Sequence, residues 1–125
     1  MPDAAEDPQT AHVIGAAIEV HKHLGPGLLE SVYEEALCYE FELRCVPYER
    51  QKPANVIYKG RIIKGQELDL VAFGEVVVEL KAVQRTLDYF LAQLLSQLQA
   101  TGLKRGLIIN FGKRTLVEGV QRVSL

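Results

Sequence analysis

The sequence has no tryptophan, only two cysteines and no apolar run long enough to span a bilayer. Cys38 and Cys45 lie seven residues apart and lack the Cys-x-x-Cys spacing of a zinc site. We therefore expect reduced thiols, with Cys38 in the core and Cys45 half-buried near a helix end; a structural disulfide is the less favoured alternative. The first nine residues are acidic and polar and contain no signal-peptide core, so we expect a cytoplasmic protein.

The composition is that of one globular domain. Hydrophobic residues occupy 48% of the 125 positions and charged residues 24%, which is typical of a chain that buries a core. A chain of this length is long enough for one core and too short for two. We expect residues 1–9 to form a flexible N-terminal tail and residues 10–125 to form a single domain.

Charge is unevenly distributed along the chain. Residues 1–43 contain one lysine and nine acidic residues, a net charge of −8, whereas residues 44–125 contain thirteen basic and seven acidic residues, a net charge of +6. A segregated basic half is typical of a surface that binds a polyanion. The alternative is an acidic helical layer that packs near a basic sheet edge. Because the net charge of the whole chain is −2, we expect weak, salt-sensitive binding of nucleic acid unless a metal ion assists.

Hydrophobic periodicity and turn signals predict three helices and five strands. Thr10 and Thr86 are the expected N-caps of the first and third helices. The predicted helices cover about residues 11–24, 28–44 and 87–100, and the predicted strands about residues 53–58, 62–73, 76–81, 106–111 and 116–123. The order is α-α-β-β-β-α-β-β. A helix between the strands at 76–81 and 106–111 allows one parallel pair, so we expect an α/β fold with a mixed sheet and helices against it.

The stretch from residue 67 to residue 81 reads as two mostly apolar strands joined at Gly74-Glu75. Charged groups seldom lie on buried strands unless they are paired or bind a metal. Pairing the two strands as a hairpin would bring Asp69 near Glu79, with Lys81 one pleat further on. Two carboxylates offer oxygen ligands that suit Mg²⁺. The alternative is a solvated ion pair between Glu79 and Lys81 at a strand end.

Two further groups of polar residues have both a functional and a plain interpretation. Glu30 lies in the first turn of the second predicted helix, with Tyr33 on the same face, and a glutamate there is often only a favourable partner of the helix dipole. Gln93 and Gln97 lie one turn apart on the flank of the third predicted helix, where two amides are more often solvated than functional.

The segment from Gly27 to Tyr33 fits the pattern Gly-x-x-Glu-x-x-Tyr. In this pattern the chain resembles the GxxExxY proteins, small prokaryotic proteins assigned to the PD-(D/E)xK nuclease-like superfamily. The resemblance extends from about Val13 to Val123 and includes Asp69 and residues 78–83, 93–95, 100–103 and 106–112. It implies a restriction-endonuclease-like fold, a mixed β-sheet flanked by helices.

The resemblance also implies a set of site residues. Asp69 and Glu79, with the backbone carbonyl of Leu80, would hold Mg²⁺ or Mn²⁺. Lys81 would orient or deprotonate the attacking water and stabilise the charge that grows on the phosphate. Glu30 matches an acidic residue that the first helical layer contributes to such sites, where it can hold a metal-bound water molecule. Gln93 matches the glutamine of a Gln-x-x-x-Tyr helix motif, but Gln97 replaces the tyrosine, which leaves the role of that helix open.

The expected function is therefore metal-dependent hydrolysis of phosphodiester bonds in DNA or RNA, catalysed by Asp69, Glu79, Lys81, Glu30 and Gln93. Candidates for contacts with nucleic-acid phosphates are Arg50, Lys52, Lys59, Arg61, Lys64 and Arg85. No base-reading module is visible, so sequence specificity would be low or supplied by a partner. One alternative is a nuclease-like binding module without turnover, acting as a subunit of a larger complex. Another alternative is that Asp69, Glu79 and Lys81 form a structural ion-pair network. The oligomeric state is open, and a homodimer would be unsurprising.

Overall fold

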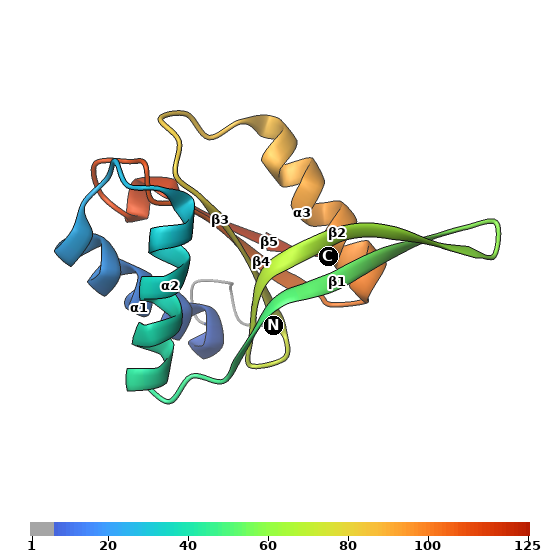
Figure 1. Ribbon diagram of the computed structural model, residues 1–125, viewed down its shortest axis with the longest axis horizontal. Coiled ribbons are helices and arrows are strands. Elements are labelled where there is room, and N and C mark those ends of the chain that lie inside the picture. The colour runs from blue at the N-terminus through green and yellow to red at the C-terminus, as the bar shows by residue number, and fades with distance from the viewer. Residues whose placement is uncertain (1–6) are drawn as a thin grey trace.

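A computed structural model describes residues 7–125 as three helices and five strands (Figure 1). The helices are α1 (Pro8–Leu24), α2 (Glu30–Leu43) and α3 (Asp88–Thr101). The strands are β1 (Tyr48–Tyr58), β2 (Arg61–Ala72), β3 (Val76–Lys81), β4 (Arg105–Asn110) and β5 (Val120–Ser124), with a short 3₁₀ helix, η2 (Val117–Gly119), before β5. The predicted order α-α-β-β-β-α-β-β is confirmed.

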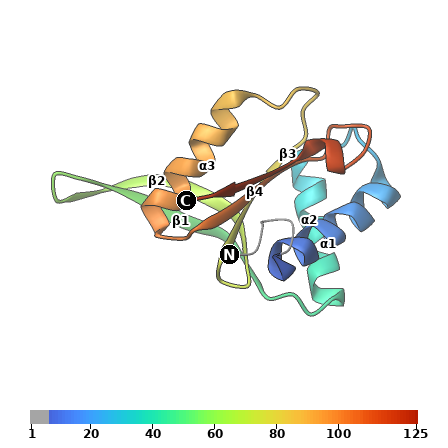
Figure 2. The ribbon, with the colours of Figure 1, turned by 180° about the vertical axis from the view of Figure 1, so that it is seen from behind.

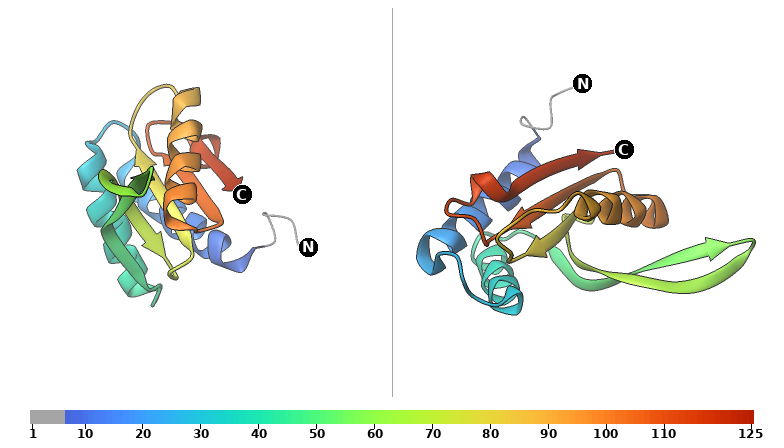
Figure 3. Two further views of the ribbon diagram at one scale, coloured as in Figure 1. Left: turned by 90° about the vertical axis from the view of Figure 1, so that its right-hand side faces the viewer. Right: turned by 90° about the horizontal axis from the view of Figure 1, so that it is seen from above.

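The strands form one sheet in the order β1-β2-β3-β4-β5. β3 and β4 are parallel and all other neighbours are antiparallel, so the predicted mixed sheet is confirmed. α3 makes the connection between the parallel strands, as such a crossover requires. α1 and α2 lie on one face of the sheet and α3 on the other (Figure 3), and β5 forms the edge opposite β1 (Figure 2).

Two apolar clusters fill the space between the sheet and the helices. Successive side chains of β3 alternate between them: Val76, Val78 and Leu80 pack with α1 and α2, whereas Val77 packs with α3. Burial of apolar surface on both faces explains why β3 reads as an almost continuous apolar run. Glu79 follows Val77 on the α3 side of this alternation, so a carboxylate points into a layer of otherwise apolar contacts.

The hairpin of β1 and β2 is longer than the sequence indicated and projects well beyond the rest of the sheet (Figures 1 and 3). β1 pairs with β2 from Tyr48 and Ala72 to Tyr58 and Arg61. β3, by contrast, pairs only with residues 70–72 of β2. We call residues 53–66 the arm: over this range the two strands have only each other as hydrogen-bonded neighbours within the described chain.

Several element boundaries differ from the prediction. α1 begins at Pro8 because Asp7, not Thr10, is its N-cap and accepts hydrogen bonds from the backbone of Gln9 and Thr10. Residues 8 and 9 are therefore helical, while the first six residues of the expected tail lie outside the described residues. α3 begins at Asp88, with Leu87 as N-cap.

The last predicted strand is shorter than expected, because residues 117–119 form η2 before β5 starts. Both cysteines are free, and Cys38 is buried as predicted. Burial raises the pKa of the Cys38 thiol to about 11, which keeps it protonated and unreactive at neutral pH. Cys45 is exposed rather than half-buried; it follows the end of α2 and has a left-handed backbone conformation. None of the helices in residues 7–125 has the length and apolar character needed to cross a membrane.

Candidate active site

The candidate site lies where β2 and β3 separate. The backbone ladder between the two strands ends at Leu70 and Val78, and the next positions are Asp69 and Glu79. Their side chains continue the connection: Glu79 Oε1 accepts from the Asp69 N–H at 3.3 Å, and Asp69 Oδ2 accepts from the Leu80 N–H at 2.9 Å. The hairpin thus brings the two carboxylates together, as the sequence pattern led us to expect.

The positive charge and hydrogen-bond donors near the two carboxylates do not offset the cost of burying their negative charge. Glu79 is only 4% exposed, and burial together with the neighbouring Asp69 raises the pKa of its carboxyl group to about 7. Burial also raises the pKa of Asp69, with a further contribution from Glu34, although the Leu80 N–H and Lys81 oppose the shift. The ionised forms of these two neighbouring carboxyl groups are both disfavoured. A bound cation would stabilise the ionised forms and offset the repulsion between them.

The Leu80 carbonyl faces the same junction. Along a strand, the N–H and C=O of one residue point toward the same neighbour, and successive residues alternate. The Leu80 N–H points toward Asp69 in β2, whereas the Lys81 carbonyl accepts from the Phe111 N–H on the β4 side at 2.8 Å. The Leu80 carbonyl therefore points toward Asp69, on the side that the expected ligand set requires.

Lys81 ends β3 on the same face as Glu79, and it is half-buried. Its Nζ lies 4.6 Å from the centroid of the Phe90 ring and donates to Gln93 Oε1 at 3.3 Å. No ion pair of Lys81 is found among residues 7–125, and Glu79 is buried, so the plain interpretation as a solvated ion pair does not describe this pair. α3, rather than a carboxylate, holds the ammonium group in place.

A chain of amides connects Lys81 to the base of the arm. Gln93 Nε2 donates to Gln66 Oε1 at 3.2 Å, and Gln97 Nε2 donates to the same oxygen at 2.8 Å. Gln97 is only 3% exposed, so the interpretation of a solvated amide is wrong for it. Its Oε1 is buried without a hydrogen-bond partner in the described part of the chain. Sequence analysis missed Gln66, because a single glutamine in a polar strand segment carries no recognisable signal.

Glu30 is the first residue of α2 and is exposed as a whole. Partial burial of its carboxyl group and the nearby Asp69 raise the pKa of Glu30, and Lys81 opposes that shift. Glu30 is thus close enough to feel the charges of both site residues. Within residues 7–125, however, no three or more His, Cys, Asp or Glu residues lie together as a ready metal-binding group. The acidic pair of Asp69 and Glu79 forms the centre, and Glu30 lies outside it.

The donor set at the junction fits a divalent cation of the Mg²⁺ type. Asp69 and Glu79 each use one carboxylate oxygen for a backbone N–H, which leaves each with a second oxygen. Carboxylate and carbonyl oxygens are the ligands that Mg²⁺ and Mn²⁺ prefer in proteins. With two carboxylates and the Leu80 carbonyl, the residues present suit such an ion, and remaining ligands would have to come from water or substrate.

The residues of the Gly-x-x-Glu-x-x-Tyr pattern hold α2 in position. Tyr33 is fully buried, and its ring stacks on that of Phe111 with centroids 4.5 Å apart. Its hydroxyl accepts from the Leu28 N–H at 3.2 Å and donates to the Gly25 carbonyl. Gly27 has φ +104°, a conformation that side chains rarely adopt. The tyrosine thus fixes the loop that leads into Glu30, which gives the spacing of the pattern a physical reason.

Asn110 anchors the loop that follows Lys81. It lies opposite Lys81 in the register of β3 and β4 and is fully buried. Its Oδ1 accepts from the Val83 N–H at 3.1 Å and the Gly112 N–H at 2.9 Å, while its Nδ2 donates to Thr86 Oγ1 at 3.1 Å. Thr86 therefore serves this network and does not cap α3. Sequence analysis assigned Asn110 no role, although a polar residue at the end of an apolar run was a usable signal.

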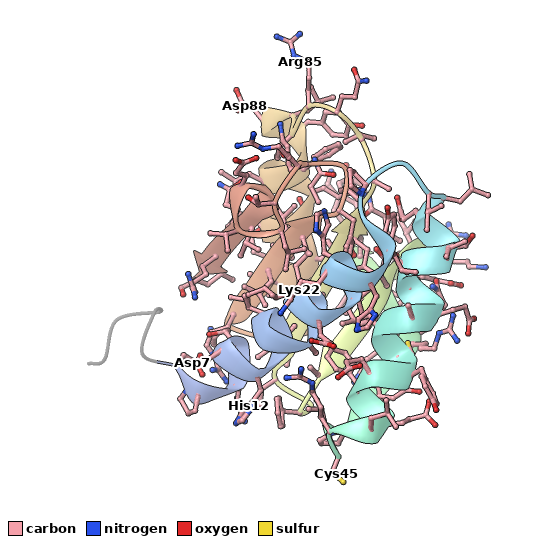
Figure 4. The ribbon with its side chains drawn as sticks, turned by 90° about the vertical axis from the view of Figure 1, so that its left-hand side faces the viewer. Asp7, His12, Lys22, Cys45, Arg85 and Asp88 are labelled. Atoms are coloured by element: carbon pink, nitrogen blue, oxygen red, sulfur yellow. The ribbon has the colours of Figure 1, made fainter. Side chains whose placement is uncertain are left out.

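The six candidate phosphate-binding residues fall into two groups. Arg50 donates to Glu34 and Glu35 of α2, at 2.6 and 2.8 Å, and Lys52 pairs with Glu49 at 3.4 Å. These two cations are already engaged with carboxylates. The other four are exposed and make no ion pair within residues 7–125; they are Lys59, Arg61 and Lys64 on the arm and Arg85 in the loop after β3. Arg85 projects at the end of the molecule near Asp88 (Figure 4).

A comparison with protein-family models matches residues 7–123 to the PD-(D/E)XK nuclease superfamily. No curated protein and no solved structure gives a match. The matched region includes every site residue described above, and it indicates a function of the nuclease type. It also confirms the expected restriction-endonuclease-like fold. The GxxExxY group remains a resemblance in the sequence pattern.

Proposed function

We propose that this chain, which belongs to the PD-(D/E)XK nuclease superfamily, hydrolyses phosphodiester bonds in nucleic acid at the junction of β2 and β3. One observation carries the proposal: Asp69 and Glu79 lie side by side, both with raised pKa through burial and like charge, next to the ammonium group of Lys81. A divalent cation, Mg²⁺ or Mn²⁺, bound to Asp69, Glu79 and the Leu80 carbonyl would polarise the phosphate and make a water molecule more acidic.

The protein's own residues then have distinct tasks. Lys81, held by Phe90 and Gln93, stabilises the negative charge that develops on the phosphate oxygens, and it can orient or deprotonate the attacking water. Glu30 accepts a hydrogen bond from water at the edge of the site. Its carboxyl group is close enough to Asp69 and Lys81 for both charges to influence its pKa. Gln93 acts as a positioning residue for Lys81, together with Gln66 and Gln97, because a fixed ammonium group needs no reorganisation during the reaction.

Nucleic acid would be held by the four exposed cations, Lys59, Arg61, Lys64 and Arg85. Arg50 and Lys52 contribute less, because their charges are already paired with carboxylates. No described helix has the placement of a recognition helix, so we propose that intrinsic sequence specificity is low. We expect the reaction to take place in the cytoplasm.

The test is cleavage of supercoiled plasmid, single-stranded DNA and structured RNA with Mg²⁺ or Mn²⁺. The control is Lys81→Ala protein purified in the same way. We expect metal-dependent cleavage by the wild type and its loss in the variant. Equal residual cleavage by both proteins would reveal a contaminant and contradict the proposal.

The competing function is a nuclease-fold binding module without turnover. It is favoured by one observation, that the described residues contain no ready group of three metal-ligating side chains. Calorimetry with Mn²⁺ separates the two: binding that Asp69→Asn abolishes supports the enzyme, and absence of binding to the wild type supports the module. Binding without cleavage of any of the three substrates would also favour the module.

A further inference from the structure

The arm, residues 53–66, is a two-stranded antiparallel ribbon that extends away from the domain (Figures 1 and 3). At about 3.3 Å per residue, the six steps from Gln66 to Gly60 carry its tip roughly 20 Å beyond the base. Isolated two-stranded ribbons are marginally stable in water. The arm is thus a surface that needs an explanation of its own.

The charge of the arm has one sign only. Lys59, Arg61 and Lys64 lie within it, and residues 53–66 contain no acidic residue. All three cations are exposed, and none is in an ion pair among residues 7–125; Lys59 lies over the ring of Tyr58, with Nζ 5.4 Å from its centroid. Elsewhere on β1 the cations are paired with carboxylates, as Arg50 and Lys52 show. The arm therefore presents unpaired positive charge at a distance from the acidic helices.

Apart from the buried Ala54, the large apolar side chains of the arm are also exposed. Ile57 and Ile62 face each other across the two strands and are 72% and 70% exposed. Val56 and Ile63 form the next cross-strand pair, on the opposite face, and both are exposed as well. Clustered apolar surface of this kind marks a binding surface rather than a solvated hairpin. The occupant must accept apolar contacts and positive charge together.

The base of the arm is fixed relative to the candidate site. Gln66 is bonded to Gln93 and Gln97 of α3, and Gln93 in turn accepts from Lys81. Gly65 allows the strands to approach closely where the register shifts, since a Cβ there would lie 2.3 Å from the Ala54 carbonyl oxygen. A groove of about 270 Å³ runs between the arm and α3 and includes Gln66 and Gln97 in its lining. Hydrogen bonds thus connect Lys81 to the base of the arm, and the groove lies beside this connection.

We infer that the arm lies in the major groove of double-stranded DNA, on one side of the phosphate that is cleaved. The inference rests on the proposed function for its orientation, because Asp69 and the arm belong to the same strand. The major groove of B-form DNA, about 12 Å wide, admits a two-stranded ribbon, whereas the major groove of duplex RNA is too narrow for side chains to enter. Roughly 20 Å of arm covers about six base pairs.

Within that groove each kind of side chain has a matching partner. Arg61, Lys64 and Lys59 contact phosphates on the groove walls. Ile57 and Ile62 contact thymine methyl groups and other apolar base edges on the groove floor. A second copy of this chain is a poorer occupant, because two arms laid together would oppose cations of the same sign.

The test compares an arm variant with a control of equal charge. Arg61→Gln with Lys64→Gln removes two arm cations, whereas Lys22→Gln with Arg122→Gln removes one exposed cation from α1 and one from β5, at the opposite sheet edge. Metal-free proteins are titrated into a fluorescent 30-base-pair DNA duplex, the corresponding duplex RNA and one single strand, at several salt concentrations. The fluorescence anisotropy gives each dissociation constant.

We expect the arm variant to bind duplex DNA at least about tenfold more weakly, and the slope of log K against log salt to fall by about 2, one for each lost phosphate contact. The control should lose far less of either, and wild-type protein should bind duplex RNA more weakly than duplex DNA. A second variant, Ile57→Thr with Ile62→Thr, should weaken DNA binding without changing the salt slope.

Equal binding by arm variant and control would overturn the inference. So would equal affinity for duplex DNA and duplex RNA, or a wild-type dimer in sedimentation that the isoleucine variant dissociates while DNA binding is unchanged. The proposed function can fail separately. If the wild type binds duplex DNA through the arm but cuts nothing with any metal, the arm inference stands and the nuclease does not.

Discussion

The two ends of β2 differ in both the sign and the burial of their charged side chains. At one end, Asp69 lies between buried residues, and burial raises the pKa of its carboxyl group. At the other, Arg61 and Lys64 are exposed to solvent. A buried charge interacts strongly with a group in contact with it, because water does not screen the interaction. Exposed cations instead favour binding of a polyanion by releasing its counterions. Under the proposed function, one strand thus combines a short-range chemical group with a longer-range recognition surface.

Under the proposed function, this difference gives a reason for an acidic pair beside a long hairpin. A carboxylate pair in a poorly solvated junction repels the substrate's own negative charge until a cation is bound. In our proposal, cations on the arm bring that substrate near without entering the site, since the arm tip lies roughly 20 Å beyond the base of the arm. The proposal therefore predicts that recognition and chemistry can be changed independently.

Asp69→Asn should have the largest effect. Loss of one of two carboxylate ligands removes a contribution of several kcal/mol to cation and transition-state binding, so cleavage should fall by more than about 100-fold. Single-turnover assays of DNA cleavage with Mg²⁺ measure it. Glu67→Gln, an exposed residue two positions earlier in β2, is the matched control and should retain full activity. A similar loss in the control would show that the site is not confined to the junction.

The stability of the metal-free protein should fall as pH rises. Burial and Asp69 raise the pKa of Glu79 from 4.5 to about 7, so the folded protein binds a proton more tightly than the unfolded chain does. Between about pH 4.5 and pH 7 the folded state therefore loses up to about 3 kcal/mol of stability relative to the unfolded state. Urea unfolding from pH 5 to pH 8 in EDTA measures this change.

Glu79→Gln should remove most of that pH dependence and raise stability at pH 8, while Glu118→Gln, an exposed acid on η2, should change neither. Added Mg²⁺ should stabilise the wild type at pH 8 and not the Glu79→Gln protein. A destabilised Glu79→Gln protein at pH 8 would instead indicate a structural network whose loss leaves a partner unpaired.

Tyr33→Phe should have the smallest effect on stability. The ring stack on Phe111 survives, but the hydroxyl group no longer bridges the Leu28 N–H and the Gly25 carbonyl, a loss of about 1 kcal/mol. Thermal unfolding gives the stability and cleavage assays give the rate. We expect the rate to fall while the affinity for duplex DNA is unchanged, because the loop positions Glu30 and is remote from the arm. Weaker DNA binding would contradict the separation of the two ends.

The sequence predicted the order of elements because each carries its own periodicity or turn signal, from the Gly25-Pro26-Gly27 loop to the apolar run of β4. It also indicated Asp69, Glu79 and Lys81, because charged residues on apolar strands stand out against their neighbours. The predicted strands cover the arm, but the start of β1, residues 48–52, was missed, since the polar residues near Arg50 carry no strand signal.

The remaining site residues depend on contacts that no local pattern contains. Gln66 joins Gln93 and Gln97 across 27 and 31 positions of chain, and Asn110 holds Val83 from the neighbouring strand. The predicted caps Thr10 and Thr86 are sound choices by type, but Asp7 reaches the first turn of α1, and Asn110 engages Thr86. Tertiary hydrogen bonds decided these cases.

The most direct test of the account measures rate and affinity together. Single-turnover cleavage of a 30-base-pair DNA duplex with Mg²⁺ is followed over a range of protein concentrations for the wild type, Lys81→Ala and the Arg61→Gln, Lys64→Gln arm variant. We predict that Lys81→Ala lowers the rate at saturation and leaves the half-saturating concentration unchanged, whereas the arm variant raises that concentration and leaves the saturated rate unchanged. If both variants change the same quantity, the two ends of β2 do not have separate functions.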